Sequence, residues 1–362
     1  MSSDTSWFAE LEESVPAFLQ SLKPGTQAGR YLPCRRGATA VGKEMGLGWS
    51  CFVAKTLHIL NRWSALELRE REEWVKFIQS FQREDGAFED PPEMAYLQKP
   101  PGFTARILGL IGRGPWRPEP RSIMLAETKQ AIATLAEGGA SPHHIFRDFP
   151  FTPETVKSWL EAQNWARPWG AGGQSAGLVV FIKTQAPAFL PQRDVDELLD
   201  VCRDFFASIA DNQTGAYFRG PVPAHGELIN GAMKVLTALA WLDVQPHYAE
   251  ALVRTCLAHP PHATGCHLVD AVYVLHQCLP QGGDATVRDY CDRVVKLIRV
   301  HANDDGGFSF NVRKAQTNYY GVPVSRGLTE SDLQGTCLLV WALAMIQRLT
   351  SPEHATWRII KP

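Results

Sequence analysis

The chain has 362 residues, of which 45% are hydrophobic, and a formal net charge of −2 at pH 7. This length and composition are enough for two ordinary domains or for one large helical domain with a sizeable core. A net charge near zero, with no basic stripe, argues against a nucleic-acid partner, and no apolar run reaches the ~18 residues of a transmembrane segment.

The first predicted element is an amphipathic helix over residues 6–22, with Trp7, Leu11, Val15 and Phe18 on one side. Acidic residues interrupt any apolar run that would resemble a signal peptide. We expect the helix to pack on the body of the protein because it has no basic face, although its apolar side could contact a membrane surface. A single domain is predicted over residues 1–362, in which residues 1–40 supply this helix and a lead-in.

Two kinds of helix alternate along the rest of the chain. Amphipathic helices with charges on one side are predicted over residues 69–82, 121–135, 153–163, 194–210, 247–257 and 286–301. Helices that are apolar almost all round are predicted over residues 47–60, 103–111, 172–183, 227–242, 267–279 and 332–346. A helix with one polar face belongs on the outside of the protein, where that face meets solvent. A helix without a polar face needs neighbours on every side. The predicted fold class is therefore all-α, a single-domain α/α toroid with an apolar inner ring and an amphipathic outer ring.

A turn that combines glycine with an aromatic residue recurs at Gly86, Gly215 and Gly306. The gaps correspond to roughly three and then two units of about 43–46 residues, which suits two helices and their connections. Prolines lie between amphipathic helices and the apolar helices that follow, so the long loops are expected at the N-terminal ends of the inner helices. Residues 137–151 are irregular, which leaves six or seven helix pairs open.

These turns carry a resemblance to a known superfamily. In Phe77–Phe88 a glutamine-rich helix leads into Asp-Gly-Ala-Phe, and Asn303–Phe308 contains Asp-Gly-Gly-Phe. Both segments are similar to the repeats of terpenoid cyclases and protein prenyltransferase β subunits. The resemblance implies an α/α toroid whose substrate is an isoprenoid.

Two apolar helices resemble the segments that supply the zinc ligands of prenyltransferase β subunits. Asp270 matches the zinc-binding aspartate, but Val272 stands where that family has cysteine and Gly335 where it has histidine. A single carboxylate does not hold zinc. The resemblance therefore implies a lost zinc site, and we expect no metal or cofactor, apart from Mg²⁺ if the substrate is a diphosphate.

The distribution of cysteine and histidine does not indicate a metal site. The eight cysteines are scattered without a Cys-x-x-Cys pair, which is typical of reduced thiols and predicts a cytoplasmic protein. His259, His262, Cys266 and His267 crowd into one short stretch, but prolines and a glycine interrupt it, and we interpret this cluster as incidental.

The first turns of the inner helices are expected to supply the polar groups of a central cavity. Asp270 lies in an apolar helix, where loss of solvent would raise its pKa and make it a general acid. The alternative is a carboxylate satisfied by backbone N–H groups at a helix start. His267, three residues earlier on the same face, is its predicted partner, or else it bonds a loop carbonyl. Asp332 is a third catalytic candidate or a helix cap.

Further side chains are candidates for substrate binding. Arg106, within an apolar helix, needs an anionic partner such as an aspartate or a diphosphate. Aromatic rings would stabilise a carbocation, or would simply fill the core. The polar candidates are Arg106, Gln174, Glu227 and Asn230, and the aromatic candidates are Trp49, Trp169, Tyr273, Tyr319, Tyr320 and Trp341.

Together these features predict an enzyme that starts the cyclisation or rearrangement of a small apolar isoprenoid by protonating it. One alternative is a carbohydrate-active lyase or glycosidase with a wet, open cleft, in which His225, Glu227, Tyr319 and Asp332 would matter most. Another is a toroid that binds a partner without catalysis. The oligomeric state is left open.

Overall fold

The computed structural model describes residues 2–100 and 118–361, with side chains from residue 7 onward. Within these residues the secondary structure is helical apart from one short hairpin, so the all-α prediction is confirmed. The predicted helix over 103–111 lies outside the described residues. No described helix combines the length and the hydropathy that crossing a bilayer requires.

The chain divides into two compact units. Unit 1 consists of residues 1–144 and 300–337, and unit 2 consists of residues 145–299 and 338–362. Buried helices alternate with helices that expose one side to solvent, and this alternation can be followed in each unit separately. The closure of six or seven helix pairs into one ring, in one domain, stays a prediction.

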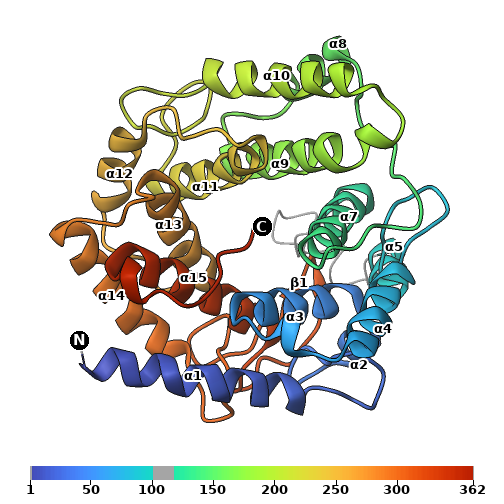
Figure 1. Cartoon of the computed structure of the whole chain (residues 1–362), viewed down its shortest axis with the longest axis vertical. Coiled ribbons are helices and arrows are strands. Elements are labelled where there is room, and N and C mark those ends of the chain that lie inside the picture. Colours follow the sequence, from blue (N-terminus) through green and yellow to red (C-terminus); the bar gives the residue numbers. More distant parts are fainter. Residues whose placement is uncertain (1, 101–117, 362) are drawn as a thin grey trace. The chain divides into compact units, whose positions relative to one another are not determined.

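In unit 1, helices α3 and α7 pack on each other, and α4 contacts both (Figure 1). Helix α5 packs against α2, α7 and the hairpin strand β2. The elements are α1 (Ser2–Ser21), α2 (Ala40–Glu44), α3 (Leu47–Ile59), a 3₁₀ turn (Trp63–Ala65), α4 (Leu68–Gln79), α5 (Pro91–Gln98), α7 (Pro120–Glu137), β1 (Asn318–Tyr319) and β2 (Val322–Pro323).

The N-terminal helix α1 packs on unit 1, as expected. Leu11, Val15 and Phe18 are buried. The ring of Trp7 lies 6.3 Å from that of Phe308, centroid to centroid, in an edge-on arrangement. The apolar side of α1 is therefore covered by protein in unit 1.

One helix of unit 1 differs from its prediction. The segment 121–135 was expected to be an outer helix with a wet face, but in α7 only Arg121 and Ala136 are exposed. Thr128 shows how a polar group of α7 is covered, since its hydroxyl accepts a hydrogen bond from the backbone N–H of Phe88 at 2.9 Å. The outer-helix prediction for α7 is therefore wrong, since charge along a helix does not reveal whether other elements cover it.

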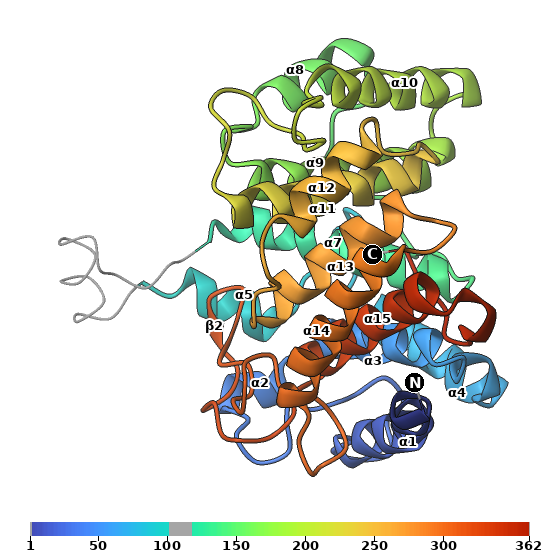
Figure 2. The same cartoon turned by 90° about the vertical axis from the view of Figure 1, so that its left-hand side faces the viewer.

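Unit 2 is layered. Helices α8 and α10 pack on each other, α10 packs on α9, α9 on α11, and α11 on α13, which also contacts α12 (Figure 2). As predicted, α9, α11 and α13 are buried along most of their length, whereas α8, α10 and α12 each bury one side. The elements are α8 (Pro153–Glu161), α9 (Pro168–Thr184), α10 (Gln192–Ser208), α11 (His225–Leu242), α12 (Ala249–Leu257), α13 (Gly265–Cys278), α14 (Ala285–His301) and the 3₁₀ turns Ala186–Ala188 and Pro352–His354. Helix α15 (Leu333–Thr350) begins in unit 1 and belongs to unit 2 from residue 338 onward.

The three glycine–aromatic turns fold alike. Each closes with an isolated antiparallel bridge onto the aromatic residue, and each glycine has a positive φ, for example 86° at Gly86. In unit 1, the N–H of Phe88 donates to Thr128 on α7, and that of Phe308 donates to Thr336 on α15 at 3.0 Å. Within unit 1, the helix that bonds the first turn is therefore α7.

Candidate functional site

The strongest predicted acid, Asp270, lies one turn into α13 of unit 2. Its side chain is buried, with 4% of the residue exposed, because α13 is apolar around it. Burial raises the pKa of its carboxyl to about 6, although the charge of Lys234 acts in the opposite direction. This environment favours the neutral acid, which is the form that can donate a proton.

Asn230, on α11, joins Asp270 to His267. In the orientation that satisfies its neighbours, the amide nitrogen lies 3.3 Å from Oδ2 of Asp270 and the amide oxygen accepts from Nδ1 of His267 at 3.2 Å. His267 is half-buried, and its pKa is lowered by burial first and then by the nearby His262 and His225. The predicted pair thus occurs as a group of three, with the amide between the carboxyl and the imidazole.

Two predicted aromatic residues lie in the same unit. Tyr273 is one turn beyond Asp270 on α13, and its ring centroid is 5.1 Å from that of Trp341 on α15. Both are buried. The indole N–H of Trp341 is also buried and has no hydrogen-bond partner among the described residues.

Other predicted residues of unit 2 have local roles. The carboxylate of Glu227 accepts the backbone N–H of Trp169 at 2.9 Å, near the start of α9, and Trp169 is 46% exposed. Gln174 is half-buried in α9. Nε2 of His225 lies 3.0 Å from the carbonyl oxygen of Thr255.

The histidines of unit 2 form two ring pairs. The centroids of His225 and His259 are 4.2 Å apart, and those of His262 and His267 are 4.8 Å apart. Among the described residues, no three His, Cys, Asp or Glu side chains form a group that could hold a metal ion.

Asp332, in unit 1, has the contacts of a helix cap, which was the predicted alternative to a catalytic role. Its Oδ1 accepts the N–H of Gly335 at 2.7 Å, and its Oδ2 accepts those of Phe310 and Gln316 at 2.8 and 2.9 Å. Burial raises the pKa of this carboxyl to about 6, and the three backbone N–H groups oppose that shift. The carboxylate therefore ties the start of α15 to the preceding loop.

Three predicted aromatic residues come together elsewhere in unit 1. The ring of Tyr319, on β1, lies 5.1 Å from that of Trp49 and 4.5 Å from that of Tyr320, centroid to centroid. The hydroxyl of Tyr319 donates to Oε1 of Glu127 on α7 and accepts from Nε2 of Gln130 at 3.4 Å. An aromatic cluster with a buried carboxyl therefore lies beside α3 and α7.

Two acidic residues at this cluster were not predicted from the sequence. Glu127 and Glu93 are 1% and 0% exposed, and burial raises the pKa of each. Glu127 was assigned to an outer helix, and Glu93 to a proline-rich connection. One signal was available: Glu127, Ala131 and Thr134 recur at the spacing of one helix face, and that face is buried.

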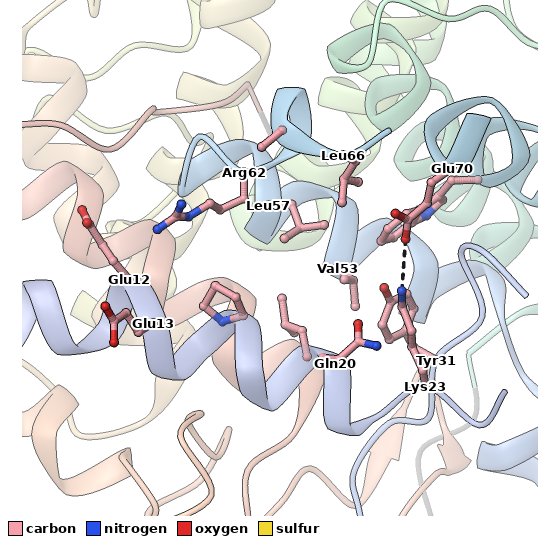
Figure 3. A pocket seen from close by; sticks show the side chains of 14 residues that line it. Glu12, Glu13, Gln20, Lys23, Tyr31, Val53, Leu57, Arg62, Leu66 and Glu70 are labelled. Carbon is pink, nitrogen blue, oxygen red and sulfur yellow. Dashed lines mark hydrogen bonds and ion pairs between the residues drawn. The ribbon is translucent and has the colours of Figure 1, made fainter. Parts of the chain in front are cut away.

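A groove of about 610 Å³ opens on unit 1 between α1, α3 and α4 (Figure 3). Val53 and Leu57 supply apolar surface, and an ion pair of Lys23 with Glu70 at 3.1 Å crosses one end (Figure 3). None of the predicted site residues lines this groove. The remaining predicted residue, Arg106, lies outside the described residues.

Comparisons with known proteins give remote structural likenesses. No protein-family profile matches the sequence, and no curated protein matches it. A polysaccharide lyase structure aligns over 98% of this chain and 100% of its own, with 12% identity and a TM-score of 0.46. A glycosyl hydrolase family 88 structure from Bacteroides vulgatus aligns over 94% and 98%, with 10% identity and a TM-score of 0.42. A type II terpene cyclase from Scytonema, solved with geranylgeranyl dihydroxybenzoate, aligns over 93% and 98%, with 14% identity and a TM-score of 0.40. Likenesses at this level assign no activity to the chain.

Proposed function

We propose that the chain is an enzyme that protonates an apolar isoprenoid substrate and so starts its cyclisation or rearrangement, with Asp270 as the proton donor. The observation that supports this role is the burial of the Asp270 carboxyl in an apolar helix, with the amide of Asn230 as its hydrogen-bond donor. A carboxyl whose pKa is about 6 is partly protonated near neutral pH. An exposed aspartate would be almost fully ionised there.

The proposed reaction needs no co-reactant. The proton of Asp270 passes to a carbon of a substrate double bond, which leaves a carboxylate on the protein and a carbocation on the substrate. A proton lost from a neighbouring carbon to water then forms the new double bond, and water returns a proton to the carboxylate. His267 is half-exposed and lies against the same amide, which suits it to exchange protons with solvent.

Aromatic rings would stabilise the cation. Tyr273 follows Asp270 by one helical turn, and its ring centroid lies 5.1 Å from that of Trp341. The negative faces of such rings attract a positive charge, most strongly where water is excluded. Glu227, Trp169 and Gln174 would then orient the substrate around this acid.

The test is turnover by the purified full-length chain. The protein is incubated with farnesyl diphosphate, geranylgeranyl diphosphate and squalene, and the extracts are analysed by mass spectrometry. We expect an isomer or cyclic product of one of them, reduced at least ~100-fold in Asp270→Asn, since a positioned general acid typically contributes that much. Glu197→Gln, on the exposed side of α10, is the matched control and should keep the wild-type rate. No product with wild type, or an undiminished rate in Asp270→Asn, would refute the proposal.

A carbohydrate-active enzyme is the second candidate, and His225 favours it. This histidine is half-exposed, and its pKa is lowered by burial first and by His259 last, so it is a neutral base near pH 7. A lyase would use such a base on a uronic-acid polymer. Incubation with polygalacturonate and alginate, followed by absorbance of the unsaturated product, distinguishes the two candidates. A chain that is inactive in both assays would match the non-catalytic alternative.

A further inference from the structure

Two buried glutamates and a buried tyrosine lie on neighbouring elements of unit 1. Glu93 comes from α5, Glu127 from α7 and Tyr319 from β1, and α5 packs directly on α7. Tyr319 donates its hydroxyl proton to Oε1 of Glu127. Oε2 of Glu127 and both carboxyl oxygens of Glu93 are buried without a hydrogen-bond partner among the described residues.

The charges around the pair oppose full ionisation. Burial is the largest cause that raises the pKa of both glutamates, and the charge of Glu127 raises that of Glu93 further. Asp90, which precedes α5, adds another negative charge, whereas Lys55 on α3 is the cation that favours the ionised form of Glu127. Two adjacent buried carboxylates destabilise the folded protein because they repel each other without solvent. One shared proton removes this repulsion and provides a hydrogen-bond donor for a carboxyl oxygen that otherwise has none.

The chain holds Tyr319 against this pair with a specific backbone shape. Tyr320 and Gly321 have φ values of 44° and 84°, so they form the two-residue turn between β1 and β2 that a right-twisted hairpin prefers. A Cβ atom at Gly48 would lie 2.9 Å from the hydroxyl oxygen of Tyr319. Glycine at position 48 therefore leaves the space that this hydroxyl occupies, while Trp49 packs on its ring.

We propose that Glu93 and Glu127 share one proton and, with Tyr319, form a second site, in unit 1, for a neutral ligand with an apolar body and an oxygen acceptor. The rings of Trp49 and Phe52 lie 5.1 and 5.9 Å from that of Tyr319 and suit an apolar body. The surrounding carboxyls repel anions. The shared proton is donated to the ligand oxygen as a hydrogen bond and remains on the glutamate pair, so the two carboxyls are never both ionised. This site does not depend on the role proposed for Asp270.

The shared proton is tested by carbon NMR of the full-length protein with ¹³C-labelled glutamate carboxyls, titrated with pH. We expect one glutamate carboxyl to remain protonated at neutral pH in wild type and in Asp270→Asn. In Glu93→Gln the like charge is removed, so the resonance of Glu127 should titrate at lower pH. In Tyr319→Phe the donor to Oε1 is removed, so it should titrate at higher pH.

Controls keep the result interpretable. Glu84→Gln, exposed in unit 1, removes one glutamate resonance and should leave the pair unchanged. If Glu93→Gln does not fold, Glu93→Asp and Tyr319→Phe carry the test. Wild-type spectra in which every glutamate is ionised at neutral pH would overturn the proposal, even if Asp270 proves to be an active acid.

The ligand class is tested by the same resonances. Geraniol, a neutral apolar alcohol, is added in one series, and geranyl diphosphate, its anionic counterpart, in another. We expect geraniol to shift the resonances of Glu93 and Glu127 and the diphosphate to leave them unchanged. A shift with the diphosphate alone, or with neither compound, would overturn the assigned ligand class.

Discussion

At the scale of single residues, the buried carboxyls differ in the hydrogen-bond donors that they accept from. Asp332 accepts three backbone N–H groups, Asp270 is bonded by one side-chain amide, and Glu93 has no hydrogen-bond partner among the described residues. Backbone donors stabilise the charged form and fix the chain. The pKa is raised to about 6 at both Asp332 and Asp270, so we assign the chemistry to the carboxyls that are not tied to the backbone.

This difference predicts opposite effects of two isosteric substitutions. Asp332→Asn replaces an acceptor by an amide that cannot accept from both sides, so we expect a loss of about 1–3 kcal/mol in the free energy of unfolding. Asp270→Asn removes a carboxyl whose ionisation is unfavourable in place, so stability at pH 7 should be unchanged or higher. Urea denaturation of both variants measures the difference, and equal destabilisation would contradict it.

The pH dependence of stability should report Asp270 directly. Its pKa in the folded protein is about 6, above the ordinary value of 3.8, so the folded state binds more protons than the unfolded state between these values. Stability from this group therefore falls as the pH rises through that window, by up to about 3 kcal/mol. Thermal unfolding of wild type and Asp270→Asn from pH 4 to pH 7 should give a shallower decline for the variant. Parallel curves would show that the carboxyl ionises normally.

At the scale of elements, the burial of a helix could be predicted from the sequence where the helix itself is apolar on nearly all sides. The helices α3, α9, α11, α13 and α15 are apolar almost all round, so their burial could be read from composition alone. The spacing of His267 and Asp270 likewise placed them correctly on one face of α13.

Other features depend on contacts between distant segments. The outer-helix prediction for α7 failed because its polar residues are covered by partners such as Phe88 and Tyr319. The contact of Tyr319 with Glu127 joins residues 192 positions apart, and no local pattern indicates it. Asn230 was predicted as a site residue, but its position between Asp270 and His267 required the packing of α11 on α13.

Two glycines on buried helices predict opposite outcomes. At Gly48 on α3 an added Cβ would meet the Tyr319 hydroxyl at 2.9 Å, whereas at Gly173 on α9 it would meet nothing within 4 Å. Gly48→Ala should therefore destabilise the protein by about 1–3 kcal/mol through overpacking, and Gly173→Ala should stabilise it by about 0.5–1 kcal/mol through helix propensity. Chemical denaturation gives both values. The same sign for both would contradict the packing described around Tyr319.

At the scale of the whole molecule, unit 1 is assembled from two segments that are far apart in the chain. Glu330 accepts the backbone N–H groups of Arg36 and Gly37 at 2.8 and 2.6 Å, across 294 and 293 positions. Residues 300–337 also supply Phe308 and Tyr319 to its core. Neither segment alone contains the partners of its buried groups.

A fragment of residues 1–144 is therefore expected not to fold cooperatively. It would lack the carboxylate of Glu330 and the ring of Tyr319, so buried donors and apolar surface would face water. Circular dichroism during heating should show a broad, non-cooperative transition for the fragment and a sharp one for the full chain. A sharp transition in the fragment would mean that the C-terminal segment is dispensable.

The contacts made by Glu330 also determine the order in which the protein can mature on the ribosome. At about 5–20 residues per second, roughly 10–40 s separate the synthesis of residue 144 from that of Glu330. Throughout that interval the first segment of unit 1 has left the ribosome without its completing strand and loops, while the continuous stretch 145–299 is already being delivered. Unit 2 likewise waits for residues 338–362, so neither unit is complete before the last part of the chain is made. The nascent N-terminal region waits longest for its partners and should be the part that chaperones bind.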